Sequence, residues 1–119
     1  MTALETAKRI VAVLDEKKAV DISVLRVRDI TVITDYFIVA SGTSSTHVKS
    51  LADDVEFRLK QQGIAPAFIE GYTGAQWIAL DYGDVILHVF YPESRRFYDL
   101  EHLWADGERI DLQSWLTQA

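Results

Sequence analysis

The chain has 119 residues, of which 49% are hydrophobic, and this size and composition fit one domain with its own apolar core. It contains no cysteine, which excludes disulfide bonds, thiolate catalysis and thiolate metal ligation. Eighteen acidic and twelve basic residues give a net charge of −6. This balance disfavours nucleic acid as the main partner, because affinity for nucleic acid comes largely from Lys and Arg that neutralise phosphates.

The start of the chain has neither the basic residues nor the apolar run of a secretory signal. No apolar stretch reaches the ~18–20 residues that a membrane-spanning helix needs. We therefore expect a cytoplasmic protein without a membrane partner.

The first third of the chain predicts a helix followed by two strands. Thr2 and Glu5 have the spacing of a capping box, and apolar residues at helical spacing continue to about Lys17. Alternating apolar residues at 22–27 indicate a short strand. The continuous apolar run at 36–40 is typical of a buried central strand.

Residues 41–45 form a turn rich in helix-capping side chains, and a second helix follows it. Gly63 is expected to end that helix. The apolar stripe that would face the core consists of Val48, Leu51, Ala52, Val55 and Leu59.

The second half predicts three more strands and a third helix. Strands are expected at residues 67–69, 77–81 and 84–91, with turns around Gly71 and Gly74 and at Tyr82-Gly83. A third helix that ends near Gly107 is marked by four apolar positions at helical spacing, Phe97, Leu100, Leu103 and Trp104. The last three of these, together with Tyr98, are expected to face the core.

Together these elements predict an α/β (α+β) fold with a mixed sheet of about five strands flanked by helices. We assign residues 1–107 to one domain and residues 108–119 to a C-terminal tail. Apolar residues in the tail predict a short helical turn packed on the body.

Four segments, in consistent order and spacing, resemble the iojap or ribosomal silencing factor family. The likeness covers roughly residues 3–104 and is carried by residues 34–45, 70–71, 77–90 and 94–104. The resemblance implies a nucleotidyltransferase-like fold without enzymatic activity and without a cofactor. It also implies binding to ribosomal protein L-fourteen on the large ribosomal subunit, which blocks subunit joining and represses translation when nutrients are scarce.

The distribution of charge suits a basic protein partner better than RNA. Residues 63–92 contain no Lys or Arg but do contain Glu70, Asp81 and Asp84. An unneutralised acidic region of this kind steers a protein towards a positively charged surface. The alternative is that these charges only aid solubility.

Five residues are candidates for partner binding: Trp77, Asp81, Glu70, Tyr91 and Arg95. Trp is enriched at interface hot spots, and the alternative for Trp77 is a core position under a helix. Asp81 shares the face of Trp77 by period-two alternation, whereas turn chemistry is the expected role of Asp84.

The start of the third helix carries one predicted cap and two basic residues. Ser94 is a candidate N-cap. Arg95 and Arg96 are expected to pair with the acids at Glu70 or Asp81, and contact with rRNA is the alternative.

Metal-dependent catalysis is not expected. His47, His88 and His102 lack metal-type spacing, and His88 fits a buried, hydrogen-bonded histidine better. A nucleotidyltransferase would use a turn such as residues 41–45 and two strand carboxylates one residue apart, but Asp53 and Asp54 are adjacent on a predicted helix. We read the turn as a helix cap; a nucleotide-binding protein and a homodimeric adaptor stay open as alternatives.

Overall fold

A mixed sheet forms the centre of the structure, a computed structural model that describes residues 2–116. Within these residues the sheet has six strands in the order β3-β4-β5-β2-β1-β6. The pair β2–β5 is parallel and the other neighbouring pairs are antiparallel. The strands are β1 (Val20–Arg26), β2 (Tyr36–Ser41), β3 (Phe68–Glu70), β4 (Trp77–Asp81), β5 (Val85–Phe90) and β6 (Glu108–Arg109).

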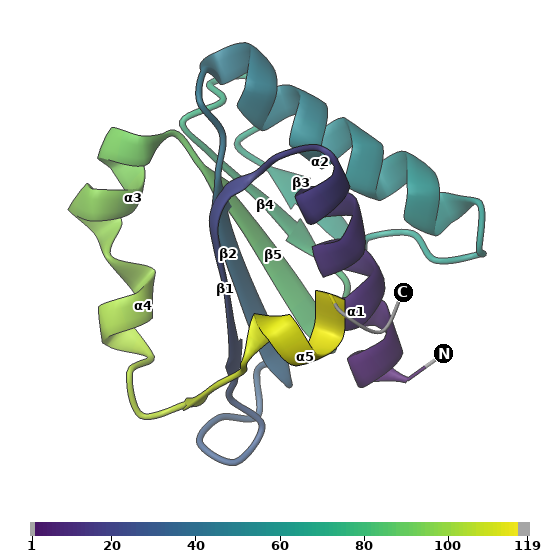
Figure 1. Ribbon diagram of the computed structural model, residues 1–119, viewed down its shortest axis with the longest axis vertical. Coiled ribbons are helices and arrows are strands. Elements are labelled where there is room, and N and C mark those ends of the chain that lie inside the picture. Colours follow the sequence, from purple (N-terminus) through teal and green to yellow (C-terminus); the bar gives the residue numbers. More distant parts are fainter. Residues whose placement is uncertain (1, 117–119) are drawn as a thin grey trace.

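One face of the sheet carries the main core. Helices α1 (Ala3–Glu16) and α2 (Ser45–Lys60) cover this face, as Figure 1 shows. The predicted apolar stripe of α2 is buried throughout, and the inward residues of the central strands, such as Ile38 and Leu87, are fully buried against it.

The predicted ends of the first two helices are confirmed. The Thr2 hydroxyl accepts from the Glu5 amide at 3.1 Å while Glu5 accepts from the Thr2 amide, which completes the capping box. Ser44 caps α2 by accepting from the His47 amide at 3.1 Å. Gly63 takes φ +80° just beyond the end of α2, a conformation that favours glycine.

The opposite face is covered only by α3 (Pro92–Tyr98) and α4 (Leu100–Leu103) among the described elements (Figure 1). The apolar cluster beneath them is small. It consists of Leu25, Val27 and Phe37, with Ile86 and Trp104 packed against it.

The predicted third helix is wrong in three respects. Asp99 takes a left-handed conformation (φ 46°, ψ 53°) and divides the helix into α3 and α4. Ser94 is not the N-cap, because α3 begins at Pro92, and the Ser94 hydroxyl bonds to Gln76 instead. Tyr98 and Leu103 are 51% and 69% exposed and do not belong to the core, since the short helices stand off the sheet.

Residues 108–116 add two further elements to the body. β6 pairs with β1, and α5 (Leu112–Leu116) brings Trp115 to Tyr36 with ring centroids 6.1 Å apart. A two-residue strand has no periodicity that a sequence could reveal. Residues 117–119 of the predicted tail lie outside the described residues. None of the helices described between residues 2 and 116 is long and apolar enough to cross a membrane.

His47 ties the end of α1 to the beginning of α2. Its Nδ1 accepts from the Thr43 amide at 2.9 Å, so Nε2 carries the proton and donates to the Lys17 carbonyl at 3.0 Å. His47→Ala is therefore expected to lower the free energy of unfolding by about 1–2 kcal/mol, because two hydrogen bonds are lost. Urea denaturation at pH 7.5 measures this change. Ser50→Ala, at an exposed position of the same helix, should change stability by much less, and equal effects would contradict the role of His47.

Candidate functional site

Strand β4 divides its side chains between the two faces of the sheet. Ile78 and Leu80 are fully buried against α1 and α2. Trp77, Ala79 and Asp81 alternate with them, are only half-buried, and therefore point to the α3–α4 side. The prediction that Trp77 and Asp81 share a face is confirmed.

Trp77 is anchored in this face without being sealed in the core. Its indole N–H donates to Nδ1 of His88 at 2.9 Å. Its ring stacks on Phe90 with centroids 5.1 Å apart, and Tyr98 of α3 lies against it at 4.7 Å. Trp77 is therefore half-buried with a fixed orientation, which the core interpretation does not fully describe and which leaves part of its ring accessible.

His88 is buried, as expected, but only one of its ring nitrogens is satisfied. Because Nδ1 accepts from Trp77, Nε2 carries the proton, and it has no hydrogen-bond partner among residues 2–116. Burial lowers the pKa of the His88 imidazole from 6.5 to about 4, although the nearby charge of Asp81 raises it. His88 therefore stays neutral near pH 7 and serves as a fixed acceptor for Trp77.

The edge strand β3 extends the same face outward. Phe68 lies opposite Asp81 and Glu70 lies opposite Ala79 in the β3–β4 pairing, so both share the Trp77 side of the sheet. Phe68 is 63% exposed, and Phe97 in α3 is 82% exposed. We call the surface formed by six residues the open face; they are Phe68, Glu70, Trp77, Asp81, Phe97 and Tyr98.

Sequence reasoning found three of these six residues and missed Phe68, Phe97 and Tyr98. The predicted strand at 67–69 places Phe68 on one face of the sheet by alternation. The sequence did not reveal that this part of the face lacks a covering helix. Asp81 also takes part in the turn chemistry that had been expected of Asp84. Its Oδ1 accepts from the Gly83 amide at 2.7 Å and so stabilises the β4–β5 turn.

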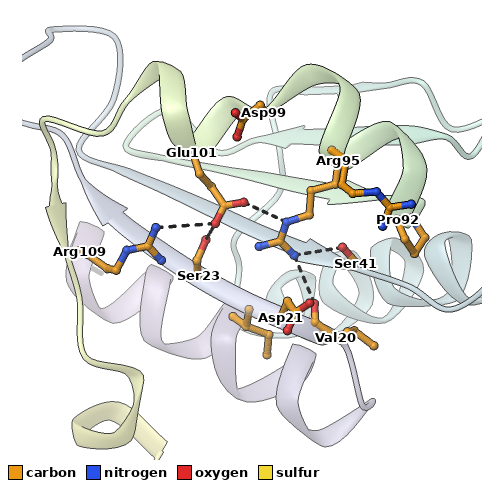
Figure 2. A pocket seen from close by; sticks show the side chains of 11 residues that line it. Val20, Asp21, Ser23, Ser41, Pro92, Arg95, Asp99, Glu101 and Arg109 are labelled. Carbon is orange, nitrogen blue, oxygen red and sulfur yellow. Dashed lines mark hydrogen bonds and ion pairs between the residues drawn. The ribbon is translucent and has the colours of Figure 1, made fainter.

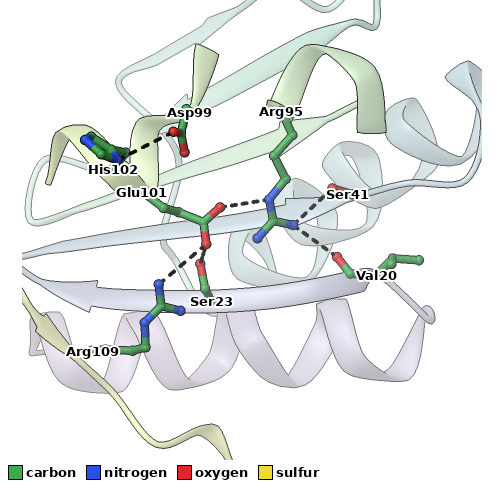
Figure 3. A network of polar contacts seen from close by, with 8 residues as sticks. All are labelled: Val20, Ser23, Ser41, Arg95, Asp99, Glu101, His102 and Arg109. Atoms are coloured by element: carbon green, nitrogen blue, oxygen red, sulfur yellow. Dashed lines mark hydrogen bonds and ion pairs between the residues drawn. The ribbon is translucent and has the colours of Figure 1, made fainter. Parts of the chain in front are cut away.

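Tyr91 and Arg95 lie apart from the open face. Tyr91 follows β5 as the N-cap residue of α3, and its amide donates to the Gln76 carbonyl at 2.9 Å. The Arg95 guanidinium turns towards the sheet and pairs with Glu101 at 3.0 Å, as Figure 3 shows. The expected pairing of Arg95 with Glu70 or Asp81 is wrong, because Glu101, at the start of α4 just after the left-handed Asp99, lies within reach of the guanidinium.

A cleft of about 560 Å³ opens beside Arg95, between α3–α4 and the edge of β1 (Figure 2). Three arginines and three carboxylates line it in near balance: Arg95, Arg96, Arg109, Asp21, Asp99 and Glu101. This mixture gives no net field that would attract an anion. Across residues 2–116, no three His, Asp or Glu side chains are grouped so that they could hold a metal ion. The turn at residues 41–45 is engaged in capping, because Ser44 and the Thr43 amide both bond to His47.

These features define an α+β domain whose distinctive surface is a patch of exposed and half-buried aromatic side chains, the residue type that protein interfaces favour, with two carboxylates beside it. The family model described as "Ribosomal silencing factor during starvation" matches residues 1–119. The chain belongs to this family.

Relatives with known names and structures agree with this assignment. "Ribosomal silencing factor RsfS" of Halalkalibacterium halodurans is 34% identical over 117 residues, which cover 98% of this chain and 100% of that protein. The mouse "Mitochondrial assembly of ribosomal large subunit protein 1" is 34% identical over 98 residues, which cover 80% of this chain and 43% of the mouse protein. A crystal structure from Chromobacterium violaceum superposes with a TM-score of 0.86 at 35% identity and covers 93% of this chain and 92% of that one. The predicted fold class is confirmed.

Proposed function

We propose that this protein binds the large ribosomal subunit through ribosomal protein L-fourteen and keeps the small subunit from joining, so that translation is repressed in the cytoplasm. Family membership supports a role in ribosome silencing. The observation that carries the docking site is the anchored, half-buried Trp77 surrounded by exposed aromatic side chains and by Glu70 and Asp81.

Charge favours a basic protein as the partner. Residues 63–92, which supply β3, β4 and β5, contain no Lys or Arg. No basic side chain on these strands therefore neutralises the carboxylates of Glu70 and Asp81. In the proposed complex they face Lys or Arg of the partner, while Trp77 fills an apolar pocket.

Silencing by this protein needs no chemistry and no cofactor. The body measures 33 × 32 × 28 Å with a radius of gyration of 13.0 Å. A rigid object of this size, seated where the two subunits meet, prevents their approach by volume alone. Affinity for the docking site then determines how completely joining is blocked.

The proposed contacts differ in importance. Trp77 is the central anchor. Because His88 already orients its indole, the side chain loses little conformational entropy on binding. Glu70 and Asp81 supply charge. Tyr91 and Arg95 lie apart from the open face, so neither is a central contact in the proposed complex.

The proposal is tested by capture of purified bacterial large ribosomal subunits on the immobilised protein, followed by a subunit-joining assay. Trp77→Ala should weaken capture by roughly 10–100-fold, the range of an interface hot spot. Asp81→Asn keeps the oxygen that accepts from Gly83 but removes the charge, and it should weaken capture less and mainly at low salt.

Asp15→Asn is the matched control, because Asp15 is an exposed acid on α1, on the far side of the sheet. It should leave both assays unchanged. Unimpaired joining at saturating wild-type protein would refute silencing, and normal capture by a folded Trp77→Ala variant would move the docking site elsewhere. A homodimer formed through the open face would compete with capture, and light scattering of the free protein detects it.

A further inference from the structure

Helix α3 supplies two of the six residues of the open face, Phe97 and Tyr98, yet neither α3 nor α4 has a buried residue, although the structure describes both completely. The two helices run from Pro92 to Leu103, and Asp99 separates them in a left-handed conformation. Burial of their own apolar side chains therefore contributes little to holding these helices over the sheet, and polar contacts become important.

Four polar side chains from four elements supply that connection, and we call them the latch: Ser23, Ser41, Arg95 and Glu101. Figure 3 shows Arg95 and Glu101 side by side above the strands. Nε of Arg95 donates to Oε1 of Glu101 at 3.0 Å. The Ser23 hydroxyl donates to Oε2 of Glu101 at 2.8 Å. Nη1 of Arg95 donates to the Ser41 hydroxyl at 3.0 Å and approaches the Val20 carbonyl at 3.4 Å.

The charged side chains of the latch are largely shielded from water. The side chains of Arg95 and Glu101 are 14% and 22% exposed, less than any side chain in the ion pairs of residues 2–116 that do not involve Glu101. Burial would raise the pKa of the Glu101 carboxyl, but hydrogen bonds from Arg95 and Ser23 and the charges of Arg95 and Arg109 outweigh it and lower that pKa. The ionised pair is therefore the stable form at neutral pH.

The latch connects directly to the open face through α3. Arg95 and Tyr98 are three residues apart and therefore neighbours on one side of this helix. Tyr98 in turn lies 4.7 Å from the Trp77 ring and 6.4 Å from Phe90. Any rotation or lift of α3 that followed loss of the Arg95 contacts would move Tyr98 away from Trp77.

The cleft shows that no packed layer can replace the latch. Its volume of about 560 Å³ lies between Arg95, Glu101 and the edge of β1, where a core would otherwise support the helices (Figure 2). Glu101 and Arg95 span this space and reach Ser23 and Ser41 on the sheet.

We infer that Arg95 and Glu101 are positioning residues for partner binding: they hold α3 so that Tyr98 packs on Trp77, and thereby assemble the open face without touching the partner themselves. This inference rests on the proposed function. It gives Arg95 an indirect role, in place of a direct contact with the partner.

Glu101→Gln and Arg95→Gln are the variants that test it, in the capture assay with purified large ribosomal subunits. Each should weaken capture by roughly 10-fold, since charge-assisted hydrogen bonds are lost that no other contact replaces. The matched control is Arg58→Gln, which breaks the 2.6 Å ion pair with Glu16 on the α1–α2 side. It should bind like the wild type. Ser41→Ala removes a single contact of Arg95 and provides a milder variant should the others fail to fold.

Combination with Tyr98→Ala separates positioning from direct contact. If the latch acts through Tyr98, Glu101→Gln should reduce capture hardly at all once Tyr98 is absent. A full 10-fold reduction in that background would overturn the inference and place Glu101 in the interface.

Amide hydrogen exchange reads the position of the helices without any partner. The amides of residues 93–104 should exchange faster in Glu101→Gln, while those of β2 and β5 stay as protected as in the wild type. Unchanged exchange at 93–104 would overturn the inference even if the ribosome were not the partner. Failure of the wild type to bind large subunits, with faster exchange in the variant, would refute the proposed function and retain the latch.

Discussion

Replacing Gly71 with alanine is expected to destabilise the protein by about 3 kcal/mol and to remove partner capture almost completely. Gly71 joins β3 to the turn before β4 and has φ +80°. A Cβ at this position would overlap the carbonyl oxygen of Trp77. Because a backbone atom cannot yield as a flexible side chain does, either the β3–β4 turn or Trp77 itself must move. Urea denaturation measures the first consequence and the capture assay the second.

Substitutions at two other glycines separate steric overlap from backbone strain as causes of the expected destabilisation. A Cβ at Gly74, in the same turn, meets no atom within 4 Å in the described part of the chain, and its φ is not positive. Gly74→Ala should be close to neutral. Gly83 has φ +84° but equally open surroundings, so Gly83→Ala measures the backbone strain alone, about 1 kcal/mol. A Gly71→Ala variant no less stable than Gly83→Ala would show that the overlap with Trp77 is unimportant.

Gly71 illustrates how far the sequence alone could lead. The run from 67 to 81 correctly predicted two strands and a glycine-containing turn between them. It gave Gly71 and Gly74 equal weight, because the distinction depends on a carbonyl six residues away that approaches Gly71 only after the strands pair. Local chemistry locates a turn, whereas tertiary contacts decide which of its residues is irreplaceable.

The same contrast separates the two layers of helices. The α1–α2 layer could be predicted because its positions repeat at helical spacing, its caps are local, and its stripes are buried. The α3–α4 layer could not, since Phe97, Leu100, Leu103 and Trp104 have the same spacing as a core helix although two of them are largely exposed. Asp99 divides this layer in a left-handed conformation that non-glycine residues rarely adopt.

Half of the residues of the open face could be predicted from the sequence, for a related reason. Period-two alternation is exact within a strand, so the shared orientation of Trp77 and Asp81 followed from their spacing. The role of Arg95 did not, because its carboxylate partner could be Glu70, Asp81 or Glu101 on charge alone. The left-handed turn at Asp99, which places Glu101 beside Arg95, selects Glu101.

Stability is expected to fall by on the order of 3 kcal/mol between pH 6.5 and pH 4 through His88 alone. Burial lowers the pKa of His88 in the folded protein to about 4, whereas the unfolded chain keeps the ordinary value of 6.5. Between these values the unfolded state binds more protons than the folded state, so acid favours unfolding. The contribution is fully present above pH 6.5 and is lost progressively as the pH falls towards 4. Urea denaturation at half-unit steps of pH measures it.

Two variants isolate the His88 contribution from the carboxylates that also titrate in acid. His88→Leu cannot be protonated and should flatten the decline between pH 6.5 and pH 5, whatever its absolute stability after Trp77 has lost its acceptor. His102→Gln removes an exposed histidine, whose side chain is 85% exposed, and should keep the wild-type slope. Parallel slopes for His88→Leu and the wild type would mean that His88 does not resist protonation. A protonated Nδ1 can no longer accept from the Trp77 indole, so capture by the wild type should weaken as the pH approaches 4, the pKa of His88 in the folded protein, and should be largely kept at pH 5.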